Sequence, residues 1–203
     1  MKSFKDHIKS LSHDKIDYFI TNSELNIFHE KIDNSVILSG SFNPLHYGHT
    51  KLLDYSSNKF DRKKFYEISI SNVDKPDINI EDLISRLENF QNDEKIIITR
   101  SSRFFEKANL FPNSYFVIGY DTAIRILDES YLAPDESLDD LFYVIKNKLC
   151  KFIVAGRANT TIPKFNNLNL NDVIQKYRTF FYIIEEKEFR EDISSTEKRR
   201  QDN

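Results

Sequence analysis

Short apolar runs alternate with longer amphipathic segments from about residue 34 onward. Runs this short, with no polar alternation, are typical of strands buried on both faces of a sheet; they fall at 36–38, 65–71, 95–99, 115–118, 151–155 and 179–184. The segments between them repeat apolar residues every three or four positions, which predicts helices at 46–58, 80–90, 103–110, 121–127 and 138–149. Strand and helix in alternation predict an α/β fold, a Rossmann-like doubly wound parallel sheet with helices on both faces.

The first 33 residues have a different pattern. Phe4, Ile8 and Leu11, and then apolar residues from Ile16 to Ile32, follow much of the helical spacing. We therefore predict one or two amphipathic helices packed on the outside of the main domain, with residues 1–33 as a helical extension and 34–203 as the domain itself. The pattern leaves open whether the extension is a lid, a dimer interface or the trace of a fusion.

Composition narrows the class of protein. The chain has 203 residues, 29 Lys and Arg against 32 Asp and Glu, and 13% aromatic residues. A net charge of −3 gives no general attraction to nucleic acid or to an anionic membrane. A lone cysteine, Cys150, excludes an internal disulfide and a multi-cysteine zinc site. No apolar run approaches the ~20 residues of a membrane span, and the N-terminus lacks a secretory signal, so we expect a cytoplasmic protein.

The segment GSFNPLHYGH, residues 40–49, follows the first predicted strand and opens the first predicted helix. His46 and His49 are three residues apart, which places both rings on one face of the helix start. Backbone N–H groups and the positive end of the helix dipole meet there, and together they favour an anion such as phosphate. Zinc is the alternative ligand, but it needs three or four protein groups that this region does not supply.

This segment resembles the G-x-F-x-P-x-H-x-G-H signature of the nucleotidyltransferase α/β-phosphodiesterase superfamily. That superfamily includes the nicotinamide and nicotinate mononucleotide adenylyltransferases, pantetheine-phosphate adenylyltransferase and the cytidylyltransferases. The resemblance implies that His46 and His49 contact the triphosphate and stabilise the pentavalent transition state. It also implies a nucleotide-binding role for Gly40, Ser41, Phe42, Asn43 and Gly48. Asn43 stands where the family often has Asp.

Residues 193–199, ISSTEKR, are similar to the I-S-S-T-x-x-R motif of the same superfamily. The resemblance implies that Arg199 is catalytic, as a fixed cation on the β- and γ-phosphates, and that nucleotide binds at Ser194, Ser195 and Thr196. The alternative is a serine helix cap followed by a solvated basic tail.

Residues 116–121, FVIGYD, follow the fourth predicted strand and are similar to the G-x-D segment of the mononucleotide adenylyltransferases. The resemblance implies that Gly119 and Asp121 bind nucleotide, with Asp121 beside the ribose of ATP. The alternative is that Asp121 caps a helix that begins at Thr122.

Residues 99–127 look like the cytidylyltransferase-like branch of the superfamily, some members of which are thought to adenylate nicotinamide mononucleotide. The chain has no Trp, although these adenylyltransferases commonly stack the pyridine ring of the acceptor on one. Phe104, Phe105 or Tyr120 is an alternative stacking surface, or a core residue. We expect the acceptor near Thr99, Arg100, Arg103 and Phe104.

These observations predict a nucleotidyltransferase that moves a nucleotidyl group, adenylyl from ATP, to a phosphate acceptor and releases pyrophosphate. The expected acceptor is nicotinamide or nicotinate mononucleotide, an activity of NAD biosynthesis. Mg²⁺ is expected on the substrate phosphates and not in a protein metal site. A CTP-dependent cytidylyltransferase acting on a phosphorylated alcohol and a non-catalytic nucleotide-binding module are the alternatives. The sequence leaves the oligomeric state open and is compatible with a homo-oligomer.

Overall fold

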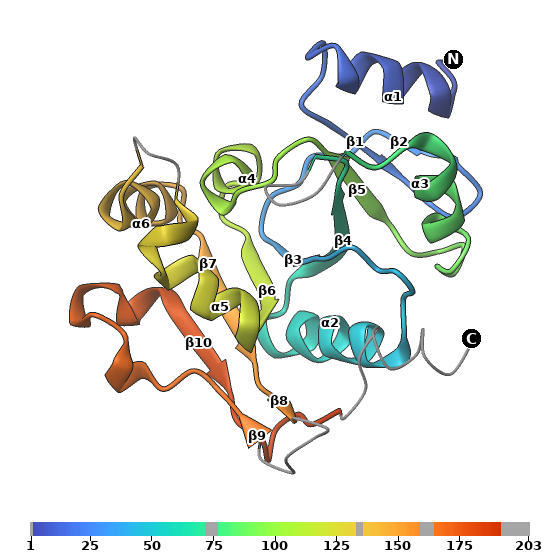
Figure 1. The fold of residues 1–203 in the computed structure, drawn as a ribbon. Coiled ribbons are helices and arrows are strands. Elements are labelled where there is room, and N and C mark those ends of the chain that lie inside the picture. The colour runs from blue at the N-terminus through green and yellow to red at the C-terminus, as the bar shows by residue number, and fades with distance from the viewer. Residues whose placement is uncertain (1, 72–76, 133–135, 159–164, 192–203) are drawn as a thin grey trace.

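One mostly parallel sheet forms the centre of the molecule (Figure 1). The computed structural model describes residues 2–71, 77–132, 136–158 and 165–191. Within them, eight strands lie in the order β10-β7-β6-β3-β4-β5-β1-β2. The six parallel strands are β3 (Ser35–Ser39), β4 (Lys63–Ser69), β5 (Ile96–Thr99), β6 (Tyr115–Gly119), β7 (Lys151–Ala155) and β10 (Phe181–Ile184).

Strand β3 occupies the point at which the strand order reverses. It pairs with β4 on one side and with β6 on the other, so the chain crosses first toward β4 and β5 and later returns to β6, β7 and β10. Counted from β3 along the chain, this is the Rossmann order 3-2-1-4-5-6. The predicted fold class is confirmed, and the carboxyl ends of β3 and β6 are where such sheets bind ligands.

Helices cover both faces of the sheet. One hydrophobic core packs under α1 (Phe4–Ser12), α2 (Tyr47–Phe60) and α3 (Ile80–Leu87). The second packs under α4 (Phe104–Leu110), α5 (Tyr120–Leu127) and α6 (Leu138–Asn147). Successive residues of β3 show why: Val36 and Leu38 enter the first core, and Ile37 enters the second.

Short elements complete the described chain. A two-stranded ribbon joins β8 (Arg157–Ala158) to β9 (Phe165–Asn166). Single 3₁₀ segments lie at η1 (Glu129–Tyr131), η2 (Leu170–Asp172) and η3 (Gln175–Phe180). No helix in the described ranges is long and apolar enough to cross a membrane.

The N-terminal segment differs from its prediction. The expected helix is present as α1, with a Ser3–Asp6 capping box and a buried face of Phe4, Ile8 and Leu11. The helical reading of residues 16–32 is wrong: the segment contains β1 (Tyr18–Thr21) and β2 (Ile27–Phe28), both antiparallel. The physical reason is that successive side chains point to opposite faces of the sheet, so Phe19 enters one core and Ile20 the other. Strand β1 also pairs with β5 and so covers its edge. The sheet therefore continues across the predicted boundary at residue 33.

Candidate active site

The turn after β3 is shaped by the side chain of Phe42. Phe42 has a positive φ of 42° and is buried, and its ring meets Tyr66, Phe90 and His49 edge-on at centroid distances of 5.1–5.4 Å. A Cβ on Gly40 would lie 3.0 Å from that ring. Packing against Phe42 thus favours a residue without a side chain at position 40. The backbone N–H of Gly40 donates to the carbonyl oxygen of Glu67 at 3.0 Å.

The two histidines of the motif stack at the start of α2. His46 is the N-cap residue of α2, and its ring lies 3.6 Å from that of His49 at an interplanar angle of 21°. The backbone N–H of His46 donates to Nδ1 of His49 at 3.3 Å. Nδ1 of His49 is therefore the acceptor, which leaves the proton of the neutral ring on Nε2.

Burial sets the charge of His49. Desolvation, followed by the nearby His46 ring, lowers the pKa of His49 from 6.5 to about 3. The ring is neutral at pH 7 in this state, so it presents an N–H donor. A bound anion would favour the imidazolium and oppose the shift.

Gly119 and Asp121 lie at the end of β6, the neighbour of β3. Gly119 is the N-cap of α5, and a Cβ added there would meet nothing within 4 Å. Asp121 lies in the first turn of α5, so the alternative that it caps a helix beginning at Thr122 is wrong. Its Oδ2 accepts a hydrogen bond from Arg157 at 2.9 Å across the end of β7, and both side chains are exposed.

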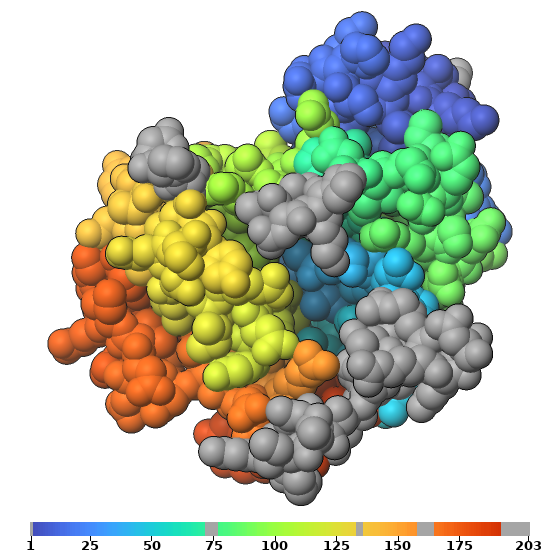
Figure 2. All heavy atoms as spheres, viewed as in Figure 1, coloured from blue at the N-terminus to red at the C-terminus, as the bar shows by residue number. Residues whose placement is uncertain are grey.

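A pocket of about 540 Å³ opens beside the loop that follows β3. Its walls come from the ends of β3 and β4, from α3 and the start of α4, and from α5, η1 and the start of α6. In Figure 2, the blue atoms of the chain after β3 lie recessed between the yellow-green α5 side and the green α3 side. Four cationic side chains and two carboxylates line it: Arg86, Arg103, Lys107 and Arg125, with Glu67 and Glu136.

A family model described as cytidylyltransferase-like matches residues 37–201. The chain belongs to the cytidylyltransferase-like family. This confirms the superfamily expected from the motifs.

Two known proteins are similar to the chain. A curated protein, the probable nicotinate-nucleotide adenylyltransferase of Fusobacterium nucleatum subsp. nucleatum, is 28% identical over 177 residues, which are 79% of this chain and 88% of the relative. A solved structure, Plasmodium falciparum nicotinic acid mononucleotide adenylyltransferase complexed with NaAD, matches 84% of this chain and 83% of its own. Its sequence identity is 21% and its TM-score 0.45.

Five of the predicted site residues line the pocket of this cytidylyltransferase-like domain: Gly40, Ser41, Asn43, Arg103 and Phe104. Asn43 is exposed and is joined to Pro44 by a cis peptide bond. Arg103 forms an ion pair with Glu136. The ring of Phe104 packs edge-on against Phe116 and Phe152, so it is partly a core residue.

Two of the residues expected near the acceptor face elsewhere. Thr99 is fully buried, and its hydroxyl donates to Oε1 of Glu67 at 2.7 Å. Arg100 pairs with Asp14 at 2.7 Å and so contacts the N-terminal segment. Neither side chain belongs to the described lining of the pocket, because Thr99 lies beneath it and Arg100 beyond the end of β5.

Other predicted residues lie outside the lining of the pocket, at the starts of two helices. His46, His49 and the buried Gly48 belong to the first turn of α2 and its cap, while Gly119 and Asp121 mark the start of α5. Ser194, Ser195, Thr196 and Arg199 lie outside the described residues. The chain leading to them runs back along α2, where Glu188 pairs with Lys59 and Glu191 with Lys51 at 2.5 Å each.

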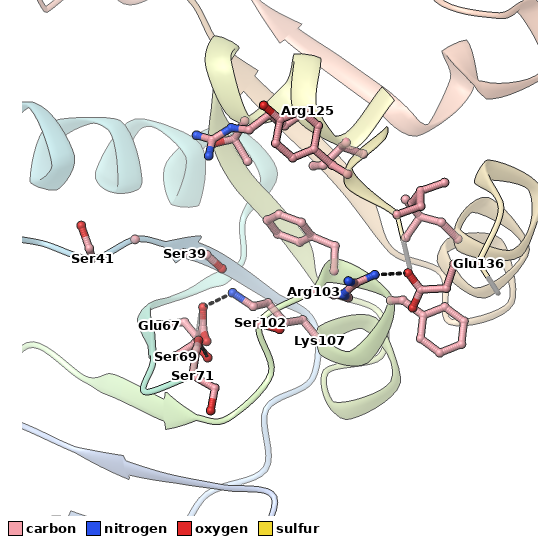
Figure 3. A pocket seen from close by; sticks show the side chains of 18 of the residues that line it. Ser39, Ser41, Glu67, Ser69, Ser71, Ser102, Arg103, Lys107, Arg125 and Glu136 are labelled. Carbon is pink, nitrogen blue, oxygen red and sulfur yellow. Dashed lines mark hydrogen bonds and ion pairs between the residues drawn. The ribbon is translucent and has the colours of Figure 1, made fainter. Parts of the chain in front are cut away.

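Sequence reasoning missed part of the pocket. Glu67 and Lys107 form a buried ion pair in its wall (Figure 3), and Arg86, Arg125 and Tyr131 also line it. Glu67 carries a signal in the sequence, because it is a charged residue between Tyr66 and Ile68 in the apolar part of a strand. The other four lie on helices or turns where a charged or aromatic side chain carries no signal of its own.

Proposed function

We propose that the chain transfers an adenylyl group from ATP to the phosphate of a pyridine mononucleotide and releases pyrophosphate. The observation that carries the proposal is the stacked His46–His49 pair at the N-terminus of α2, at the switch in strand order. Family membership and the name of the Fusobacterium relative support it.

In this reaction an oxygen of the acceptor phosphate forms a bond to the α-phosphorus, and the bond from that phosphorus to the β-phosphate oxygen breaks. The acceptor is already an anion at neutral pH, so the protein supplies no covalent nucleophile. Its task is positioning and charge stabilisation. The Nε2–H of neutral His49, the adjacent His46 and the backbone N–H groups at the N-terminus of α2 are the donors that we assign to the phosphates.

The pocket lined by Gly40, Ser41 and Asn43 of the same motif is assigned to the acceptor. Its volume lies within the range of about 300–1,000 Å³ that is usual for small-molecule sites. The excess of cationic over acidic side chains suits the acceptor phosphate. Phe104, Phe105 and Tyr131 offer ring surfaces to a pyridine, and Tyr131 is 46% exposed.

The remaining assignments of residues to ATP are proposals that rest on the sequence motifs. Asp121 is assigned to the ribose of ATP, which requires its contact with Arg157 to rearrange. Ser194, Ser195, Thr196 and Arg199 are assigned to the triphosphate. A cytoplasmic location stays a prediction.

Mg²⁺ is proposed to bind with the substrate phosphates. No group of three or more His, Cys, Asp or Glu side chains in the described ranges is arranged to hold a metal ion. The proposal therefore assigns the ion to no residue of this chain. When bound, Mg²⁺ neutralises phosphate charge.

Pyrophosphate release tests the proposal. ATP and CTP are each offered with nicotinate mononucleotide, nicotinamide mononucleotide, phosphopantetheine and phosphocholine, in the presence of Mg²⁺. We expect release with ATP and a pyridine mononucleotide. Release only with CTP and phosphocholine would establish the cytidylyltransferase alternative, and ATP binding without release would favour a non-catalytic nucleotide-binding module.

A further inference from the structure

The chain that follows β10, residues 185–191, lies against α2 and is named the strap. In Figure 1 it is the red segment below this helix. Glu188 pairs with Lys59 and Glu191 with Lys51, and in each pair 2.5 Å separates the Nζ and Oε1 atoms. The strap is therefore attached to the helix at two points.

One face of α2 carries the contacts with the strap. Lys51, Tyr55 and Lys59 follow one another at intervals of four residues, so their side chains share one side of the helix. Between the two ion pairs, the ring of Phe189 packs against that of Tyr55 at a centroid distance of 6.0 Å. Phe189 also packs against the first hydrophobic core. An apolar contact thus lies between the two charged ones.

The order of the contacts gives the direction of the strap. Glu188 binds the last turn of α2, and Glu191, three residues later, binds Lys51 in the second turn. The two lysines are about 12 Å apart along the helix axis, and three extended residues span about 10 Å. The strap is therefore nearly extended, and it runs toward the end of the helix at which His46 and His49 stack.

Glu188 fixes the beginning of the strap. Its Oε2 accepts a hydrogen bond from the backbone N–H of Glu185 at 2.9 Å, and its Oε1 accepts one from the hydroxyl of Tyr182 on β10 at 3.2 Å. The Lys59 ammonium, followed by the N–H of Glu185, lowers the pKa of Glu188 from 4.5 to about 2. The carboxylate is ionised at neutral pH, and it joins β10, the turn after it and α2.

We propose that Lys51 and Lys59 are positioning residues for the binding of ATP and act through the strap. This rests on the proposed function, in which the motif at residues 193–199 binds the triphosphate. The motif begins two residues beyond Glu191 in the sequence, and two residues of chain span at most about 7 Å. Because Lys51 is only two residues beyond His49, the attachment raises the effective concentration of the motif at the start of α2.

The experiment removes the two positive charges. In the variant with both Lys51→Gln and Lys59→Gln, a smaller fraction of molecules holds the strap on α2, and the apparent affinity for ATP falls in proportion. With a saturating pyridine mononucleotide and Mg²⁺, we expect the KM for ATP to rise by about threefold to tenfold, because partly exposed ion pairs make modest contributions. The kcat is expected to stay within about twofold of wild type, because molecules saturated with ATP have the strap in place.

Asp54→Asn is the matched control. Asp54 also lies on α2, and its Oδ1 pairs with the Nζ of Lys64 on β4 at 2.5 Å. Its loss should leave the KM for ATP within about twofold of wild type. An exchange of charges then tests the contact itself: Lys51→Glu combined with Glu191→Lys restores an ion pair, and we expect it to reverse most of the increase in KM caused by Lys51→Glu alone. A direct contact of Lys51 with phosphate would not be restored in this way.

The outcomes separate this proposal from the proposed function. An unchanged KM for ATP in the folded double variant, an equal change in Asp54→Asn, or an increase that the charge exchange does not reverse overturns the role of the strap and leaves the transferase intact. If circular dichroism shows the double variant to be unfolded, Glu191→Gln takes its place, and a KM for ATP that does not rise overturns the proposal.

If the wild-type protein releases no pyrophosphate, the proposed function fails, and calorimetric titration with ATP tests the strap by itself. A Kd for ATP that is about threefold or more higher in the double variant supports the role of the strap. An equal Kd in the two proteins overturns it.

Discussion

At the scale of single residues, the motif 40–49 contains residues needed for packing beside residues assigned to the ligand, and the sequence alone does not distinguish the two. The pairing of His46 with His49 on one helix face follows from their spacing, and the structure shows the rings stacked. The resemblance implies a nucleotide-binding role for Gly40, yet a side chain at this position would meet the ring of Phe42. Which glycine faces a side chain and which faces open space depends on tertiary packing.

The two strand-end glycines therefore make a matched pair of substitutions. Gly40→Ala places a methyl group 3.0 Å from the buried Phe42 ring, and we expect a loss of about 1–3 kcal/mol in the free energy of unfolding. Gly119→Ala meets nothing within 4 Å at an ordinary φ of −80°, so we expect its stability to stay within about 0.5 kcal/mol of wild type. Urea unfolding of both variants measures this, and equal losses would contradict the assignment of Phe42.

His49 gives the protein a defined response to acid. Its pKa of about 3 in the folded chain lies below the ordinary 6.5, so the unfolded chain binds the proton first as the pH falls. The corresponding stability is present above pH 6.5 and is lost progressively toward pH 3. Relative to His49→Gln, we expect the wild-type protein to lose about 1–3 kcal/mol between pH 7 and pH 4.5. Urea unfolding at the two pH values measures the difference, and a constant difference would contradict a neutral buried ring.

At the scale of elements, periodicity predicted the core of the fold and failed at its edge. The six parallel strands are mostly buried, and the apolar runs predict each of them within a few residues. The helical prediction for residues 16–32 is wrong because apolar residues in this segment also recur every three or four positions, and only the pairing of β1 with β2 and β5 identifies the strands. The Glu67–Lys107 pair was missed for a related reason: its partners are 40 residues apart and meet only in the folded sheet.

Removal of residues 1–33 tests how far the N-terminal elements belong to the domain. Phe4, Ile8, Leu11, Phe19 and Ile20 are each at most 6% exposed, and burial of such a side chain contributes about 1.5–3 kcal/mol. The stabilisation lost with these five side chains, together with the exposed edge of β5, is as large as the whole free energy of unfolding of a typical domain, about 5–15 kcal/mol. We expect the 34–203 fragment to be unfolded or aggregated by circular dichroism and gel filtration. A fragment with wild-type thermal stability would contradict the role of β1 in the sheet.

At the scale of the whole molecule, function is assembled from segments that are distant in sequence. The loop 40–49, the start of α5 and the walls of the pocket meet because the strand order reverses at β3. That convergence was predictable from the fold class. The lining of the pocket was not, because it depends on which side chains of α3, α4 and α5 turn inward.

Truncation after Glu191 tests the assigned role of the C-terminal motif. The shortened chain keeps the ion pairs of Glu188 and Glu191 with α2, so we expect a melting temperature within a few degrees of wild type and turnover reduced at least about 10²-fold. Arg199→Gln is expected to reproduce most of the loss, whereas Lys198→Gln, its basic neighbour, is the matched control and should retain activity. Unaltered turnover in the truncated protein would remove the motif from the mechanism.

The most direct test of the central claim is to identify the product. ATP and a pyridine mononucleotide are incubated with Mg²⁺ and either the wild-type protein or His49→Ala, and dinucleotide and pyrophosphate are quantified together by chromatography and mass spectrometry. Adenylyl transfer at the stacked histidines requires the two products in equal amounts, with a rate at least about 10²-fold lower in His49→Ala. Absence of dinucleotide, or equal rates for the two proteins, would contradict the assignment of this site.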